Sequence, residues 1–334
     1  MKVTQKDIAK KLGVSTSLVS RVLSGKAEEI GIRRELIDRV QALAKKLNYV
    51  PSSAALSLKG KKSATIGVVV YDFYDPFFTK VIGELQKVAN EENFSILLVG
   101  LTNRALSEQS LRPLYKHNVD GIIIVGSYGD ISWVSDFAEI PVARIGHGAD
   151  KRLKLSVAVD ELMAMTSICA HLSGQEAKKV VFARRNAAVH ARREGVFLDV
   201  FTAKKFSQAY SINSVCENDM LAGADIAETI LKKGDLPDAI VCASDVIAMG
   251  VIKRLSEAGV KAPRDVLITG FDDISTSACF MPSITSYRQS VEYAAQKAFY
   301  AVAKGQGNGH FDCVGELVIR ESSQKAEKSG RSGK

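Results

Sequence analysis

Short apolar runs alternate with helical patterns in two successive series along this chain of 334 residues. The first series contains "TIGVVV", "SILLVG" and "GIIIVG", and the second contains "KKVVFA", "AIVCAS" and "DVLITGF". Strands that are apolar on both faces and separated by helices are typical of parallel sheets covered by helices on each side. The two series therefore predict an α/β core of two parallel-sheet lobes.

The segment before this core predicts three short helices. Thr4 is an N-cap for the first helix, Gly13 ends it, and Ser15 caps a second helix with the sequence "TSLVSRVLSG". A third helix is predicted from about residue 33 to residue 47. Three helices with a glycine turn between the first two indicate an all-α helix-turn-helix headpiece.

The positive charge is concentrated in this headpiece and the stretch that follows it. Residues 1–62 contain 14 Lys+Arg and 5 Asp+Glu, whereas the remainder contains 31 and 32. A basic block attached to a nearly neutral body indicates a polyanionic partner such as nucleic acid. A solvated basic face would give the same charge count, so charge alone leaves both interpretations open.

Several classes of protein are disfavoured by what the chain lacks. The apolar runs are too short to cross a bilayer, and the N-terminus carries charges where a secretory signal needs an apolar segment, so we expect a cytoplasmic protein with no membrane partner. The five cysteines have no CxxC spacing and are interpreted as buried small apolar residues. No phosphate-binding loop, GxSxG or HExxH occurs, so no catalytic residue, metal site or cofactor is predicted.

Polar and aromatic residues gather in the loops expected at the carboxyl ends of the strands. These loops are "YDFYDPFF" (71–78), "RRNAAVHARR" (184–193), "ASD" (243–245) and "FDD" (271–273). Ligands of open parallel sheets bind at this edge, and stacking faces beside charged groups suit a small polar ligand. The tail, 324–334, is expected to be disordered.

A stretch between the headpiece and the core has helix-forming residues but no evident partner. It reads "NYVPSSAALSLKGK" and carries Leu56 and Leu58, which an ordinary flexible linker would not need. The pattern alone indicates only helix potential and exposed apolar side chains.

With "DIAKKLGVSTSLVSRVL", "LNYVPSSAALSLKGKKSATIGVVV", "VLITGFDDIS" and "SITSYRQS", the chain resembles the LacI/GalR family of bacterial transcription regulators. The resemblance runs from about residue 3 to about residue 320. It implies a headpiece at 1–48, a hinge at 49–62 and an effector-binding and dimerisation core at 63–323. The core is divided into one lobe of 63–160 plus 288–308 and another of 161–284 plus 309–323.

For DNA, the resemblance implies that the second helix enters the major groove and that Thr16 and Ser17 meet base edges. It also implies that the hinge becomes helical on the operator and that Leu58 wedges into the minor groove, which costs about a few kcal/mol of unstacking. The simpler reading of Thr16 and Ser17 is helix capping. The implied DNA-binding residues are Thr4, Ser15, Thr16, Ser17, Ser20, Arg21, Asn48, Tyr49, Ser52, Ala55, Leu58 and Lys59.

For the effector, the resemblance implies stacking on Phe77 and Phe78, donation from Arg192 and acceptance by Asp272. The alternative places the two phenylalanines in the core and makes Asp272 a turn cap. The implied effector-binding residues are Tyr71, Phe77, Phe78, Arg192, Ser244, Asp245, Asp272 and Gln289.

The chain also departs from the family pattern. Glu161, Gly146 and His147 stand where relatives have other polar partners, which puts a familiar sugar effector in doubt. His147 could contact the ligand or bridge the lobes, and the bridge is the favoured interpretation. In the headpiece, Arg33 and Leu36 replace the usual Ser and Thr.

The prediction is a homodimeric regulator, a repressor, that binds a pseudo-palindromic double-stranded operator under control of a small polar effector, a sugar or related metabolite. Two other classes were weighed. A solute-binding protein for transport would begin with a secretory signal, and an enzyme would need more than an acid/base set drawn from Asp245, Asp272 and His147.

Overall fold

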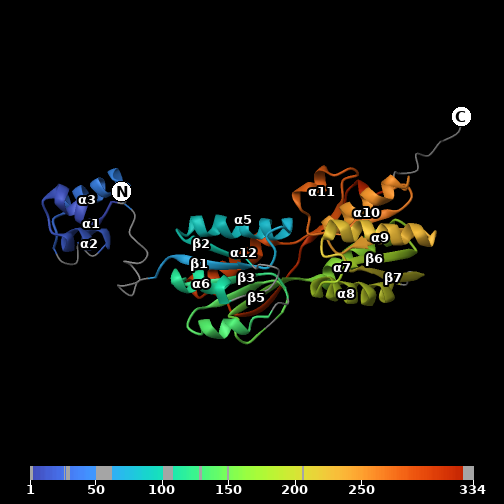
Figure 1. The fold of residues 1–334 in the computed structure, drawn as a ribbon, viewed down its shortest axis with the longest axis horizontal. Coiled ribbons are helices and arrows are strands. Elements are labelled where there is room, and N and C mark those ends of the chain that lie inside the picture. The colour runs from blue at the N-terminus through green and yellow to red at the C-terminus, as the bar shows by residue number, and fades with distance from the viewer. Residues whose placement is uncertain are drawn as a thin grey trace. The chain divides into compact units, whose positions relative to one another are not determined.

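The computed structural model describes residues 3–25, 27, 31–49, 62–100, 108–127, 130–148, 150–204 and 207–325. The chain divides into two compact units, Met1–Ser63 and Ala64–Lys334. The first is an all-α headpiece and the second is an α/β core (Figure 1).

The headpiece consists of three helices, as the sequence predicted: α1 (Gln5–Leu12), α2 (Thr16–Leu23) and α3 (Arg34–Lys46). The side chain of Thr4 accepts a hydrogen bond from the backbone N–H of Asp7, and the Asp7 carboxylate accepts one from the N–H of Thr4. Gly13 ends α1 with a φ of 67°, a left-handed conformation that glycine adopts without strain. The predicted N-cap at Thr4 and the turn before α2 are thereby confirmed.

The three headpiece helices share one small core. Ile8, Val19 and Val40, one from each helix, are fully buried, and Leu18 and Leu23 are partly buried against them. Helices this short are marginal in water alone, so their mutual packing is what stabilises them.

The first lobe of the core is a parallel sheet of six strands in the order β11-β5-β4-β3-β1-β2. The strands are β1 (Thr65–Val70), β2 (Ser95–Gly100), β3 (Gly121–Val125), β4 (Val142–Ile145), β5 (Leu155–Val159) and β11 (Gly309–Cys313). The helices are α5 (Pro76–Glu91), α6 (Glu108–Lys116), the 3-10 helix η1 (Ser132–Phe137) and α12 (Val291–Lys304).

Both faces of this sheet are covered. Val68 and Ile123 pack with α5 and α12 on one face, and Val69 and Ile122 pack with α6 and η1 on the other. Neighbouring residues of one strand thus enter different cores, which explains why the strands are apolar throughout.

The second lobe has the sheet order β12-β10-β9-β8-β6-β7, in which β12 alone runs antiparallel to its neighbour. Its strands are β6 (Lys179–Arg185), β7 (Gln208–Ser214), β8 (Ala239–Cys242), β9 (Leu267–Phe271), β10 (Thr285–Arg288) and β12 (Glu316–Val318). Its helices are α7 (Glu161–Gly174), α8 (Ala188–Lys204), α9 (Asp219–Lys233), α10 (Asp245–Glu257), α11 (Ser275–Cys279) and the 3-10 helix η2 (Glu321–Ser323).

Helices α9 and α10 lie side by side on one face of this second sheet (Figure 1). They meet through two glycines: a Cβ on Gly250 would lie 2.2 Å from the carbonyl oxygen of Met220, and a Cβ on Gly223 would lie 2.2 Å from that of Ile247. Backbone therefore touches backbone at this crossing, which leaves no room for a side chain at either glycine.

Two lobe boundaries predicted from the sequence are wrong. Residues 309–313 form β11, which pairs with β5 in the first lobe and not with the second. Arg288 ends β10 in the second lobe and does not begin the first. The chain consequently crosses between the lobes three times, after β5, after β10 and after β11.

The other sequence predictions have mixed outcomes. The predicted tail begins too early, because Lys325 donates a backbone hydrogen bond to the Gln175 side chain. Cys169, Cys242 and Cys313 are buried as expected, whereas Cys216 is half-buried and Cys279 is exposed. Within the described parts of the chain, no helix is long and apolar enough to cross a membrane.

Candidate functional site

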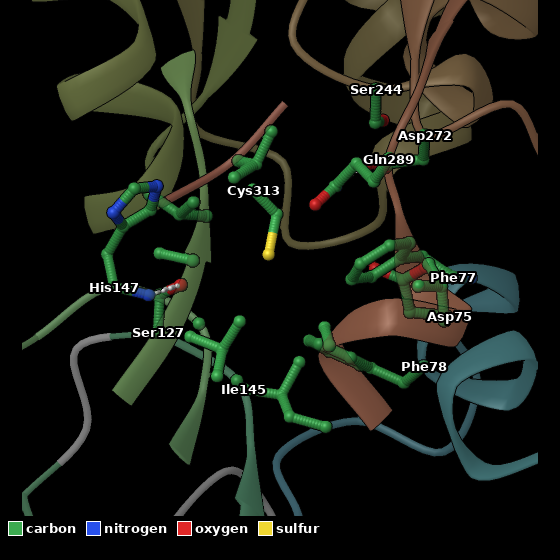
Figure 2. Close-up of a pocket in the computed structure, with 18 of the residues that line it drawn as sticks. Asp75, Phe77, Phe78, Ser127, Ile145, His147, Ser244, Asp272, Gln289 and Cys313 are labelled. Carbon is green, nitrogen blue, oxygen red and sulfur yellow. Dashed lines mark hydrogen bonds between the residues drawn. The ribbon is translucent and has the colours of Figure 1, made fainter. Parts of the chain in front are cut away.

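A cavity of about 90 Å³ lies between the two lobes of the core, at the carboxyl ends of their strands. Gln289 and Ser290 on the second crossover line it, as do Val159 and Cys313, which end the strands before the other two crossovers, and loops of both lobes. Phe77, Phe78 and Asp75 stand on one side and His147 and Ser127 on the other, with the Cys313 sulfur between them (Figure 2). The polar lining residues are Asp75, Ser127, His147, His190, Arg193, Ser244, Asp272, Gln289, Ser290 and Cys313.

Helix α5 brings an acid and two aromatic rings to the cavity. The Asp75 side chain caps the helix by accepting a hydrogen bond of 2.9 Å from the N–H of Phe77, and Pro76 follows at the first helical position. The rings of Phe77 and Phe78 are 5.7 Å apart, and Phe77 packs against the hydrophobic cores of both lobes. Burial, and next the charge of Asp272, raise the pKa of Asp75 to about 7.

Asp272 enters the cavity from the second lobe, directly after β9. Its Oδ1 accepts a hydrogen bond of 2.5 Å from the amide of Gln289, and burial raises its pKa to about 7. Its φ of 101° lies in a region that side-chain-bearing residues rarely adopt, and its N–H is fixed by the carbonyl of Tyr287. Strained backbone of this kind is concentrated at functional sites, because the surrounding structure must stabilise it.

On the side of the cavity that His147 lines, the buried carboxylate of Glu161 connects residues of the two lobes. Glu161, at the start of α7, accepts hydrogen bonds from Arg192 (3.0 Å) and Arg193 (3.2 Å), and its Oε1 lies 3.5 Å from Nε2 of His147 in the first lobe. Burial would raise the pKa of Glu161, but the hydrogen bond from His147 and the charge of Arg193 outweigh burial and lower it. The bridging role expected of His147 agrees with this contact.

The Arg193 guanidinium also donates to the carbonyl of Ala243 and stacks 3.5 Å from the ring centroid of Phe271. It is therefore held on three sides, and Glu161, which also bonds Arg192, offsets part of its charge.

A second polar network lies beneath the cavity floor. Ser244, the N-cap of α10, donates 2.7 Å to Oδ2 of Asp219, and Arg185 pairs with Oδ1 of the same carboxylate. His190 is buried beside them, and burial lowers its pKa to about 3, so the ring is neutral at physiological pH. Its Nδ1 has no hydrogen-bond partner in the described part of the chain.

Five of the eight predicted effector residues line the cavity: Phe77, Phe78, Ser244, Asp272 and Gln289. The structure does not bring the other three, Tyr71, Arg192 and Asp245, into the lining.

Each of these three has another neighbour. The Tyr71 ring packs beneath Gly126, where a Cβ would lie 2.7 Å from it. Asp245 is buried, and its Oδ2 accepts from the N–H of Ile274 and the hydroxyl of Ser277. Arg192 is largely exposed and bonds Glu161, and its neighbour Arg193 is the arginine that lines the cavity.

Sequence reasoning did not single out Asp75, Ser127, His190, Arg193 or Cys313. Asp75, His190 and Arg193 fall in the segments 71–78 and 184–193, which the sequence had already marked as ligand-binding, although His190 and Arg193 belong to α8 in the structure. No signal in the sequence pointed to Cys313, because its place in the cavity depends on the unexpected position of β11 in the first lobe. The described residues contain no group of three His, Cys, Asp or Glu side chains that could hold a metal ion.

In the headpiece, Thr16, Ser17 and Arg21 are exposed on α2 and Ser20 is half-buried. Ser15 caps α2 by accepting from the N–H of Leu18. Asn48 has a φ of 48°, and Tyr49 packs against the headpiece core. Ser52, Ala55, Leu58 and Lys59 lie outside the described residues.

Two family profiles match this chain. One, described as "Bacterial regulatory proteins, lacI family", matches residues 4–52, and one described as "Periplasmic binding protein-like domain" matches residues 169–323. The chain therefore combines a lacI-family headpiece with a periplasmic-binding-protein-like core. This lacI-family protein is accordingly a DNA-binding regulator of transcription, as the resemblance predicted.

Relatives extend over the whole length of the lacI-family chain. An "HTH-type transcriptional repressor PurR" of Haemophilus influenzae (strain PittEE) is 27% identical over 337 residues, covering 96% of this chain and 98% of the relative. A repressor of the same name from Pasteurella multocida (strain Pm70) is 26% identical over 340 residues, with the same coverage.

Solved structures confirm the predicted fold class. The lac repressor dimer bound to operator and the anti-inducer ONPF superposes with a TM-score of 0.84 at 21% identity, covering 97% of this chain and 100% of that one. A LacI family regulator from Arthrobacter sp. FB24 in complex with lactose superposes with a TM-score of 0.68 at 18% identity, covering 78% of this chain and 99% of that one.

Proposed function

We propose that this lacI-family protein is a repressor that binds a pseudo-palindromic operator as a homodimer, and that a small polar effector in the cavity between the core lobes controls its operator affinity. The observation that carries the proposal is the lining of that cavity, which draws on both lobes and on residues at or next to the points where the chain passes between them. A ligand there contacts both lobes at once, so its binding free energy depends on how the lobes are arranged. Such a difference in affinity between two states is what an effector needs in order to shift them.

The repressor assignment is supported by the names of the relatives, which are PurR repressors. These names give no support to the sugar effector expected from the sequence, so the proposal extends only to a small polar molecule. Homodimerisation is supported by the relation to the lac repressor dimer and by the logic of paired half-sites.

The DNA-binding part of the proposal keeps the residues predicted from the sequence. Thr16, Ser17 and Arg21 are exposed on α2, where they are available to base edges and phosphates. Hydroxyl side chains donate and accept, so they suit several bases, and the operator sequence has to be measured.

The operator can be selected from a random DNA library with the full-length protein. Thr16→Ala is expected to lower affinity for the selected site by about tenfold or more and to relax preference at one base pair. Thr202→Ala, an exposed threonine of the core helix α8, serves as the control and should leave binding unchanged. Equal affinity and preference in the two variants would remove Thr16 from the recognition surface.

The hinge is tested separately with Leu58→Ala and Leu56→Ala. We expect Leu58→Ala to reduce both operator affinity and DNA bending more than Leu56→Ala, because only Leu58 is proposed to unstack a base step. Unchanged bending in Leu58→Ala would refute the wedge.

The effector half is tested by a thermal-shift screen of sugars, nucleobases and related metabolites. Compounds that stabilise the protein are then added to an operator-binding titration. The expected result is a hit that changes operator affinity by about tenfold or more, in either direction. If the hits bind and none changes operator affinity, the cavity is not a regulatory site.

A further inference from the structure

Two carboxyl groups from different lobes line the same cavity. Asp75 comes from the loop before α5 in the first lobe, and Asp272 follows β9 in the second. One oxygen of each is occupied, Oδ1 of Asp75 by the N–H of Phe77 and Oδ1 of Asp272 by the Gln289 amide. Among the described residues nothing donates a hydrogen bond to the second oxygen of either carboxyl.

Positive charge on the cavity wall does not balance this pair. Arg193 lines the cavity, but its guanidinium is bonded to Glu161, which is itself buried. His190 lines the cavity too and is neutral at physiological pH, because burial lowers its pKa. Glu161 is shared between Arg192 and Arg193, so it offsets Arg193 only in part, and the two acids Asp75 and Asp272 together still exceed the positive charge that Arg193 brings to the cavity wall.

The groups behind these acids add to the imbalance. The charges of Asp219 and Asp72 raise the pKa of Asp75, as the charge of Asp272 does. The charges of Asp245 and Asp219 raise the pKa of Asp272, and the charge of Arg193 lowers it. Two neighbouring carboxyls in a low-dielectric site do not both ionise unless a cation joins them. Burial raises the pKa of each acid to about 7, so a cation placed between them would favour the charged form of both.

One further feature of the cavity points to an organic cation. Phe77 and Phe78 form an aromatic wall, and ring faces attract ammonium and guanidinium groups.

We propose that the effector carries a positively charged nitrogen, as an amine, amidine or protonated heterocycle, and that this nitrogen binds between Asp75 and Asp272 against the phenylalanine wall. The proposal rests on the proposed function, since it assigns the chemistry of the same cavity. It makes Asp75 a specificity-determining residue as well as the cap of α5.

Asp75→Asn and Asp272→Asn remove one negative charge each with little change in shape. Asparagine caps helices as well as aspartate does, so Asp75→Asn keeps the hydrogen bond from Phe77 and the start of α5. Asp199→Asn, at an exposed position on α8, is the control for a general change in charge.

The probes are pairs of matched shape: benzamidine with benzamide, and glucosamine with glucose. Each is titrated at constant ionic strength and pH 7 into the full-length protein, with the thermal midpoint as the readout. In at least one pair the cation is expected to bind about tenfold or more tightly than its neutral partner. That preference should be lost in Asp75→Asn and in Asp272→Asn and kept in Asp199→Asn.

The proposal is overturned if neither pair favours the cation, or if the Asn variants keep the preference. Because the readout contains no DNA, it is separate from the regulatory proposal. A cation preference without any effect on operator binding would contradict the proposed function and leave the charge assignment intact.

Discussion

Replacing Gly250 by alanine tests the helix crossing that holds the floor of the cavity. A Cβ at this position would lie 2.2 Å from the carbonyl oxygen of Met220 and 3.0 Å from Cα of Gly223. Both neighbours are helix backbone, so neither can rotate away, and α9 and α10 must separate by roughly 1 Å to restore ordinary contact. The same two helices carry Asp219 and Ser244, whose hydrogen bond is 2.7 Å long.

The expected cost follows from two opposing contributions. Overpacking a well-packed core costs about 1–3 kcal/mol, whereas alanine in a helix interior gains about 0.5–1 kcal/mol over glycine. Since the clash is with backbone, the upper part of the first range applies, and Gly250→Ala should lose about 2 kcal/mol. For a unit of this size that corresponds to a fall of about 4–8 °C in the thermal midpoint.

Gly195→Ala is the matched control, because Gly195 lies within α8 of the same lobe and nothing is within 4 Å of its Cβ position. It should raise the midpoint slightly through helix propensity alone. Both variants are measured by calorimetry and by urea denaturation of the full-length protein. If Gly250→Ala is as stable as Gly195→Ala, the close crossing of α9 and α10 is incorrect.

The remaining predictions concern the charges of the core. The folded-state pKa of Asp75 is raised from 3.8 to about 7, so its stabilising contribution is complete below about pH 4 and is lost as the pH rises through 7. Asp75→Asn should therefore match wild-type stability near pH 4 and exceed it by about 1–3 kcal/mol at pH 8, as read from urea midpoints. A difference that does not depend on pH would contradict the raised pKa. Glu161→Gln leaves the buried Arg193 without its carboxylate and should lower the free energy of unfolding by about 3–5 kcal/mol. The control Glu176→Gln, at an exposed site, should lower it by less than about 0.5 kcal/mol.

The pattern of apolar residues was sufficient to predict helices that have a single apolar stripe and strands that are apolar on both faces. The strand "TIGVVV" is β1 from Thr65 to Val70, and the helix predicted from about 33 to 47 is α3 from Arg34 to Lys46. Helix α7 was not predicted because its apolar residues occur on every side, so no stripe marks it. Strand β11 was placed in the wrong lobe because "GHFDC" is mostly exposed and lacks the alternation that would reveal its partner.

The site could be predicted to the level of its loops and not to the level of single side chains. Topology places ligands after parallel strands, and that rule marked the loops that hold Phe77, Phe78, Ser244 and Asp272. The choice of these side chains, and of Gln289, came from the family resemblance. Which of two adjacent arginines faces the cavity depends on the rotation of α8 about its axis, since neighbours on a helix point about 100° apart. The sequence does not give this rotation; in the structure Arg193 faces the cavity, and both arginines bond the buried Glu161.

The chain crossings explain why the cavity is suited to control. Gln289 stands on the crossover between β10 and α12, and Cys313 ends β11 just before the third crossover; both line the cavity. Any rotation of one lobe against the other changes the backbone angles of these segments first. It also changes the distance between Asp75 in one lobe and Asp272 in the other. A ligand that contacts both acids therefore binds more tightly to the lobe arrangement that holds the two carboxyls at the right distance. This difference in affinity between lobe arrangements is what allosteric control requires.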